Sequence, residues 1–151
     1  MMKHGIETEP LIDEAYQLLT SNITEKSGLW FPDKNNSLHG LVAASPDRKV
    51  MMGRKLLGLC EYKAPVHCLY NPNCSIYGFP RKYMVQVQGQ MAVCNASWCD
   101  FMAVCTRTKH IMLKRVLFNK TYWAAVSEKL QKFIQNLKVF ISLTLFLNIC
   151  C

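Results

Sequence analysis

With 151 residues, this chain is long enough for one domain with a sizeable core and too short for two comfortable ones. Half of the residues are apolar, which excludes a disordered chain, and the formal net charge of +8 suits a polyanionic partner. The first residues, MMKHGIETEP, lack the apolar core of a secretory signal. We therefore expect an intracellular protein in a reducing compartment.

The eight cysteines fit that compartment better than they fit a disulfide scaffold. Four of them lie in apolar segments, where cysteine usually behaves as a small buried hydrophobe: Cys60, Cys94, Cys99 and Cys105. A zinc site formed by His67, Cys68 and Cys74 is the alternative. The paired Cys-x₂-Cys spacing of such sites is missing, so we favour burial.

The first predicted element is a helix over residues 6–20. Its apolar residues recur at loose helical spacing: Ile6, Leu11, Ala15 and Leu18 or Leu19. Pro10 is compatible with such a helix only near the first turn. A polar turn is expected to follow at residues 21–27.

Two strands are predicted next, at 29–31 and 38–44, around the turn signal PDKNNS. Pro46 should end the second strand and leave Asp47 at its tip. Residues 47–55 are expected to form another turn. The apolar segment 56–62 then predicts a strand.

After a loop at 66–80, residues 81–94 give the clearest helical pattern. One face of this helix is apolar: Met84, Val87, Met91 and Cys94. Gln86 and Gln90 stand four residues apart on another face. Nearly all residues of 98–106 are apolar, as in a buried central strand.

The remaining elements are a mixed strand at 110–118 and a closing amphipathic helix. The helix carries its apolar residues at Tyr122, Val126, Leu130, Phe133 and Leu137. The order of elements predicts an α/β (α+β) domain over residues 1–138, with a mixed central β-sheet flanked by helices.

Residues 139–151 form an apolar tail of uncertain status. Its length is below the roughly 20 residues that cross a bilayer as a helix. A continued core helix is the first alternative, a non-native terminus the second and membrane association the third.

Three residues suggest a metal-dependent nuclease. Thirteen residues separate Asp47 from Glu61, and Lys63 follows two positions later. Carboxylates are the hard oxygen ligands that Mg²⁺ prefers. Glu61 and Lys63 share one face of the predicted strand, so both would point into one site. The alternatives are an Asx turn for Asp47 and a surface position for Lys63, but a buried Glu61 needs a partner in any case.

The sequence around these residues resembles the YqaJ viral recombinase family, the lambda-exonuclease-like branch of the PD-(D/E)xK nucleases. The resemblance rests on HGIETEPLIDEAY, AASPD, GLCEYKAP, YMVQVQGQM and WCDF, in the family's order. It covers roughly residues 4 to 135 and implies a restriction-endonuclease-like core. It also implies an exonuclease-like, divalent-metal-dependent deoxyribonuclease of viral-type recombination or replication, with Mg²⁺, or alternatively Mn²⁺, as cofactor.

The resemblance also implies roles for individual residues. Asp47 and Glu61 would hold the metal, and Glu9 would assist from the first helix. Lys63 would orient the attacking water and neutralise charge. Gln86 would fix Lys63 or a DNA phosphate, with Gln88 as a weaker candidate for that role.

The chain departs from the family's pattern at two places. It starts just before the helix that carries Glu9, without the family's preceding segment that grips the 5′ end, so it would be an N-terminally truncated member. Ala64 and Pro65 stand where the family usually has Cys-Pro.

The partner implied by the resemblance is DNA, expected to be linear and double-stranded. No stable membrane partner is expected, and the family's ring-forming members allow a homo-oligomer. The nucleus or a viral replication site would suit this activity. A non-catalytic DNA-binding remnant of the same fold is the alternative function, and a structural or membrane-tethered protein is the third.

Overall fold

The computed structural model describes residues 2–67, 75–76 and 79–149. Its main feature is a five-stranded sheet with the order β1-β2-β3-β6-β7. The strands are β1 (Thr24–Lys26), β2 (Arg48–Met52), β3 (Lys55–Lys63), β6 (Trp98–Val104) and β7 (Ile111–Leu117). β3 and β6 pair in parallel, and the other neighbours pair antiparallel. A short second sheet joins β4 (Ser75–Ile76) to β5 (Phe79–Pro80).

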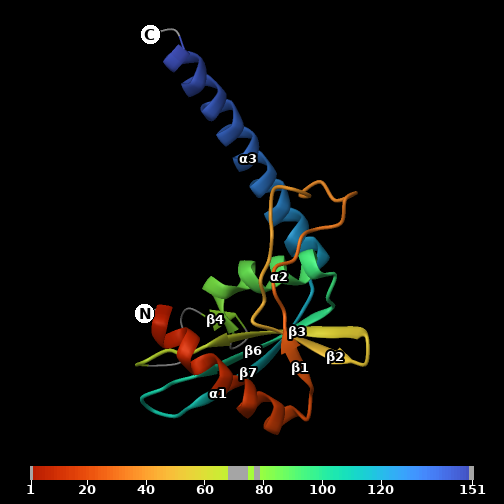
Figure 1. The fold of residues 1–151 in the computed structure, drawn as a ribbon, viewed down its shortest axis with the longest axis vertical. Helices are drawn as coiled ribbons and strands as arrows, with labels where there is room; N and C mark the ends of the chain where they lie inside the picture. Colours follow the sequence, from red (N-terminus) through yellow and green to blue (C-terminus); the bar gives the residue numbers. More distant parts are fainter. Residues whose placement is uncertain (1, 68–74, 77–78, 150–151) are drawn as a thin grey trace.

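Helices cover both faces of the main sheet (Figure 1). α1 (Met2–Thr20) packs on one face, against β3 and β6. The 3₁₀ turn η2 (Arg81–Tyr83) leads into α2 (Met84–Cys94), which packs on the other face. α3 (Lys120–Ile149) leaves the body of the molecule at its C-terminal half. The predicted mixed sheet flanked by helices is confirmed.

Each face of the sheet has its own apolar cluster. On the α2 side, Val87 and Met91 pack against strand residues such as Leu59 and Phe101. On the α1 side, Ile12 and Tyr16 pack against the other face of the strands. The apolar face predicted for residues 81–94 is therefore confirmed, and it lies on the sheet.

The predicted arrangement of residues 29–55 is wrong. Residues 34–41 form turns, and the predicted strands at 29–31 and 38–44 contribute one isolated bridge, between Trp30 and Ala44. The predicted turn instead contains β2, which forms a hairpin with β3 through Gly53 and Arg54. β2 begins with two charged residues, so its sequence is typical of an exposed turn. The strand is nevertheless half buried, because acidic residues of α1 cover Arg48.

Two smaller predictions near the N-terminus are also corrected. The expected polar turn at 21–27 contains β1, which adds an edge strand to β2. Pro10 lies well inside α1 and not in its first turn. An interior proline removes one helical hydrogen bond. Burial of Ile12 and Tyr16 against the sheet stabilises the helix beyond it.

The tail is helical as far as Ile149, which continues α3. Phe133 and Leu137 are 62% and 44% exposed, so this part of the helix does not bury the apolar face expected of it. The side chains of residues 140–151 lie outside the part of the chain that the structure describes, so the packing predicted for the tail stays a prediction. Among the helices that the structure describes, none has the length and apolar character needed to cross a membrane.

The cysteine prediction is confirmed for four of the eight residues. Cys60, Cys94, Cys99 and Cys105 are free and buried. The proposed zinc ligands Cys68 and Cys74 lie outside the described residues.

A glycine on β3 makes room for an aromatic ring. A Cβ at Gly58 would overlap the ring of Trp98, which lies against the strand. The Arg115 guanidinium stacks on the same indole, 3.8 Å from the ring centroid. Arg115 also holds Asp100 through two hydrogen bonds of 2.8 Å. This stack ties β3, β6 and β7 together on the α1 side of the sheet.

Candidate active site

The hairpin of β2 and β3 places Asp47 beside Glu61. Arg48 pairs with Cys60 in the antiparallel register, so the preceding residue, Asp47, lies opposite Glu61. The backbone N–H of Tyr62 donates a 2.6 Å hydrogen bond to Asp47 Oδ2. The two carboxylates that the sequence predicts as a pair are thus neighbours, although Asp47 lies immediately before β2 and not at the tip of a preceding strand.

Glu61 is 2% exposed, and its carboxylate is surrounded by donors. Lys63 Nζ forms an ion pair with Oε1. Gln86 Nε2 donates to the same oxygen at 2.6 Å, and Gln90 Nε2 donates to Oε2 at 2.7 Å. The partners expected for a buried carboxylate are present, and they come from β3 and α2.

Three of the predicted site residues are therefore in direct contact: Glu61, Lys63 and Gln86. Strand alternation predicts that Lys63 and Glu61 share a face, and their ion pair agrees with it. Gln86 contacts Glu61 Oε1, the same oxygen that Lys63 holds. Gln90 is a site residue that the sequence analysis missed. Its position four residues after Gln86 is the signal that could have identified it, because both amides then lie on one helix face.

Gln88 does not belong to this group. Its Nε2 donates to the Leu117 carbonyl at 2.8 Å, and its Oε1 accepts from the Asn119 N–H at 2.8 Å. Gln88 therefore fixes α2 to the connection between β7 and α3. This buried structural role accounts for the residue, and it corrects the weaker candidate assignment.

The surroundings of Asp47 disfavour its charged form. Burial, and next the charge of Glu61, raise the pKa of Asp47 to about 7, with a smaller contribution from Glu9. The hydrogen bond from Tyr62 and the charge of Lys63 act in the opposite direction. The site therefore concentrates more negative charge than its own lysine neutralises.

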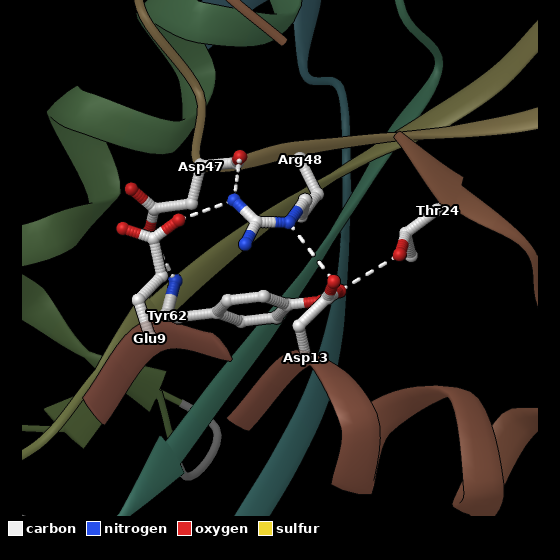
Figure 2. A network of polar contacts seen from close by, with 6 residues as sticks. All are labelled: Glu9, Asp13, Thr24, Asp47, Arg48 and Tyr62. Atoms are coloured by element: carbon white, nitrogen blue, oxygen red, sulfur yellow. Dashed lines mark hydrogen bonds and ion pairs between the residues drawn. The ribbon is translucent and has the colours of Figure 1, made fainter. Parts of the chain in front are cut away.

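A network of acidic residues around Arg48 borders Asp47 on the α1 side (Figure 2). The Arg48 guanidinium pairs with Glu9, donates to the Asp47 carbonyl at 2.7 Å and bonds Asp13 Oδ2 at 3.0 Å. Tyr62 and Thr24 donate their hydroxyls to Asp13 Oδ1 at 2.8 and 2.7 Å. The network anchors the start of β2 to α1 and so fixes the backbone of Asp47.

The same network defines the position of Glu9. Its carboxylate lies near Asp47, whose pKa it raises, but it is engaged by Arg48. Arg48 and Asp13 are further residues that the sequence analysis missed. The spacing of Glu9 and Asp13, four residues apart on one helix face, is the available signal.

The donor set fits a hard divalent cation such as Mg²⁺. Asp47 and Glu61 offer carboxylate oxygens, and a cation between them would offset both the burial of the Asp47 charge and its repulsion by Glu61, the two main causes of the raised pKa. Among the described residues no group of three or more His, Cys, Asp or Glu side chains is placed to hold a metal. Two carboxylates are still sufficient, because Mg²⁺ keeps several of its waters and is commonly held by one or two carboxylates.

Two lysines lie around one aromatic ring at the edge of the site. The Nζ atoms of Lys63 and Lys82 are 5.3 and 4.9 Å from the centroid of the Tyr83 ring. Lys63 is half-buried and committed to Glu61, whereas Lys82 is exposed. Of the two ammonium groups near the Tyr83 ring, that of Lys63 faces the carboxylates and that of Lys82 faces solvent.

Comparisons with known proteins agree with this architecture. The chain resembles the crystal structure of an alkaline exonuclease, LHK-Exo, from Laribacter hongkongensis, with 26% identity and a TM-score of 0.75 over 93% of this chain and 70% of that one. The structure of LHK-Exo in complex with dAMP matches over the same shares, with 26% identity and a TM-score of 0.76. Comparison with curated protein sequences gave no match.

The sequence also matches a family model, described as the YqaJ-like viral recombinase domain, over residues 1–97. This part holds Asp47, the Glu61–Lys63 pair and the glutamines of α2. The family and the similar structures together indicate a nuclease. The chain belongs to the YqaJ-like viral recombinase family.

Proposed function

We propose that this protein is a divalent-metal-dependent deoxyribonuclease with exonuclease-like activity, which hydrolyses phosphodiester bonds of linear double-stranded DNA in viral-type recombination or replication. The observation that carries the proposal is the contact set around Glu61. A buried carboxylate neighbours Asp47 and is held by Lys63, Gln86 and Gln90 at one end of the sheet. Burying several charged and polar groups together costs free energy that apolar residues would not, and such clusters are typical of functional sites.

Each residue has a distinct task in this proposal. Asp47 and Glu61 would hold Mg²⁺, which when bound polarises the phosphate and lowers the pKa of a bound water. Lys63 keeps its ammonium at the carboxylate pair, where it can orient the attacking water and balance charge on the phosphate. Gln86 and Gln90 hold both oxygens of Glu61 in one orientation.

The charge distribution supports DNA as the partner. The formal net charge is +8, and phosphate contacts supply most of the affinity of proteins for DNA. Lys82 offers an exposed cation next to the Lys63 side chain, at the place where a bound strand would approach the carboxylates. LHK-Exo forms a complex with a deoxynucleotide, dAMP, which is consistent with a DNA substrate here.

The test is a cleavage assay on end-labelled linear and circular duplexes with Mg²⁺, Mn²⁺ or EDTA. We expect metal-dependent loss of linear DNA and survival of the covalently closed circle. Asp47→Asn and Glu61→Gln should abolish cleavage and retain DNA binding. Asp33→Asn, which makes the same change at an exposed turn residue, is the matched control and should cleave like the wild type.

The outcome also decides between the two functions that share this fold. DNA binding by a wild-type protein that cleaves no substrate under any metal condition would establish the non-catalytic DNA-binding alternative. Equal cleavage by the wild type and Asp47→Asn would refute the assignment of the site.

A further inference from the structure

A cleft of about 320 Å³ lies between residues 42–45, α2 and the first turns of α3. Its volume falls at the lower end of the range of small-molecule sites, about 300–1,000 Å³. Most of its lining is apolar, with Val85 and Val93 on α2 and Trp123 and Leu130 on α3. It therefore has room for one group of modest size.

The cleft adjoins the candidate active site. Gln86 and Gln90 both line it, and both donate hydrogen bonds to Glu61. Ser45, two residues before Asp47, also lines the cleft. A group bound in the cleft would thus be separated from the catalytic carboxylate only by the side chains that hold it.

Two features of the lining suit a flat heteroaromatic group with an N–H donor. Trp123 offers an indole ring that lies close to Gly89 of α2: a Cβ at Gly89 would be 3.2 Å from that ring. Gln90 is 5% exposed, and its Oε1 is buried with no hydrogen-bond partner among the described residues. An unpaired buried acceptor is costly, so a ligand that donates to it gains a contact that the protein alone lacks.

We propose that this cleft is a nucleobase subsite, which holds one base of the DNA strand whose phosphate lies at Asp47 and Glu61. The base would lie against Trp123, and it would donate an N–H to Gln90 Oε1 once the Gln90 amide turns this buried atom toward the cleft. The inference rests on the proposed function and deepens it: the strand would be positioned by a base as well as by its phosphates. Stacking of this kind does not depend on sequence, because every base has a π-face.

The first test detects the base in the cleft without any catalysis. Duplexes with 5-iododeoxyuridine placed at one position at a time near the end are bound in EDTA, irradiated and digested for mass spectrometry. We expect one position to crosslink to peptides that contain Trp123 or residues 42–45. Adducts from every position that map only outside the cleft would overturn the proposal.

The second test fills the cleft from its rim. Ala43→Phe and Val85→Phe change exposed lining residues, and Ala124→Phe changes an exposed residue of α3 that does not line the cleft. Thermal unfolding establishes that all three variants are folded. Single-turnover cleavage is then compared on duplexes with a base or an abasic site at the crosslinked position.

For the wild type and Ala124→Phe, we expect the abasic site to slow cleavage by about 5- to 150-fold, the range that loss of one stacked base implies. The two cleft-filling variants should cleave both duplexes at similar, reduced rates. An abasic penalty equal in all four proteins would overturn the subsite and leave the nuclease function intact. Absence of cleavage by the wild type would instead refute the proposed function, and the crosslinking in EDTA would still decide on the cleft.

Discussion

Gln90 donates a 2.7 Å hydrogen bond to Glu61 Oε2 from a position 29 residues further along the chain. The other oxygen of the carboxylate is held by Gln86 and Lys63. Both oxygens of the carboxylate therefore have protein donors, and two of these donors come from α2. Residues that orient a metal-binding carboxylate in this way usually affect metal affinity as strongly as they affect rate.

Replacement of Gln90 by leucine should lower cleavage by about 10- to 100-fold, the range found for residues that orient metal ligands. The change keeps the volume of the side chain but removes the donor to Glu61. A higher Mg²⁺ concentration should recover part of the rate, which a magnesium titration of single-turnover cleavage measures. Gln135→Leu, at an exposed position of α3, is the matched control. No change in the magnesium dependence would contradict the role assigned to Gln90.

Replacement of Lys63 by alanine should reduce the single-turnover rate by about 10²–10³-fold, because a positioned charge near the reacting atoms is lost. Lys63→Arg should recover little, since a planar guanidinium cannot occupy the place of a compact ammonium. Lys55→Ala, at the exposed start of β3, is the control. Rates for Lys63→Ala within a factor of about three of the wild type would reduce Lys63 to a structural residue.

The ionisation of Asp47 should destabilise the metal-free protein as the pH rises. Its pKa is about 7 in the folded state and 3.8 for an unperturbed aspartate, so the destabilisation is absent below about pH 4 and complete above about pH 7. Each pKa unit corresponds to about 1.36 kcal/mol, which places an upper limit of about 4 kcal/mol on the effect. Asp47→Asn should therefore unfold at a higher temperature than the wild type in EDTA at pH 8, with a smaller difference at pH 5.

Addition of Mg²⁺ provides the control for that measurement. It should stabilise the wild type at pH 8 more than at pH 5, because the cation must compete with the proton for Asp47. Asp47→Asn should gain little at either pH. A wild-type magnesium response that does not vary with pH would contradict the raised pKa.

Arg48→Met should destabilise the protein by about 3–5 kcal/mol, because it leaves Asp13 and Glu9 partly buried without their cation. Lys49→Met removes the neighbouring ion pair with Glu25, whose side chain is 51% exposed, and should cost less than about 1 kcal/mol. Urea unfolding of both variants measures the contrast. Equal destabilisation would mean that the network around Arg48 contributes no more than a surface pair.

Lys82→Ala should weaken DNA binding and reduce the magnitude of the salt slope by about 1, as expected for one lost phosphate contact. Cleavage at saturating DNA should stay close to the wild-type rate, because Lys82 faces solvent and not the carboxylates. Lys138→Ala on the exposed part of α3 is the control. An unchanged salt slope would mean that Lys82 does not contact a DNA phosphate.

The parts of this molecule that depend on local pattern could be predicted from the sequence. The apolar face of α2, the buried strand β6 and the shared face of Glu61 and Lys63 all follow from helix and strand periodicity. The contact between Glu61 and Gln86 also depends on how α2 packs on β3. Periodicity indicates which face of α2 packs on the sheet, but not which residues of the helix and the strand come into contact.

The parts that depend on distant partners could not be predicted. β2 begins with a buried arginine, which looks like a solvated turn until α1 supplies Glu9 and Asp13. The pairing of Asp47 with Glu61 likewise depends on the register of a hairpin. Gly53 marks the turn of that hairpin, but the residue types around it do not fix which residues of the two strands pair. Residue types alone also give no reason to separate Gln90, which holds Glu61, from Gln88, which fixes the end of β7.

The contact of Gly58 with Trp98 has a consequence for the evolution of this fold. Any side chain at position 58 would displace the indole, and with it the Arg115 stack that holds Asp100. Selection should therefore act on the two positions as one unit. Homologues that keep a large aromatic residue at the position of Trp98 should keep glycine at the position of Gly58, and lineages that lose the glycine should carry a small residue in place of the tryptophan.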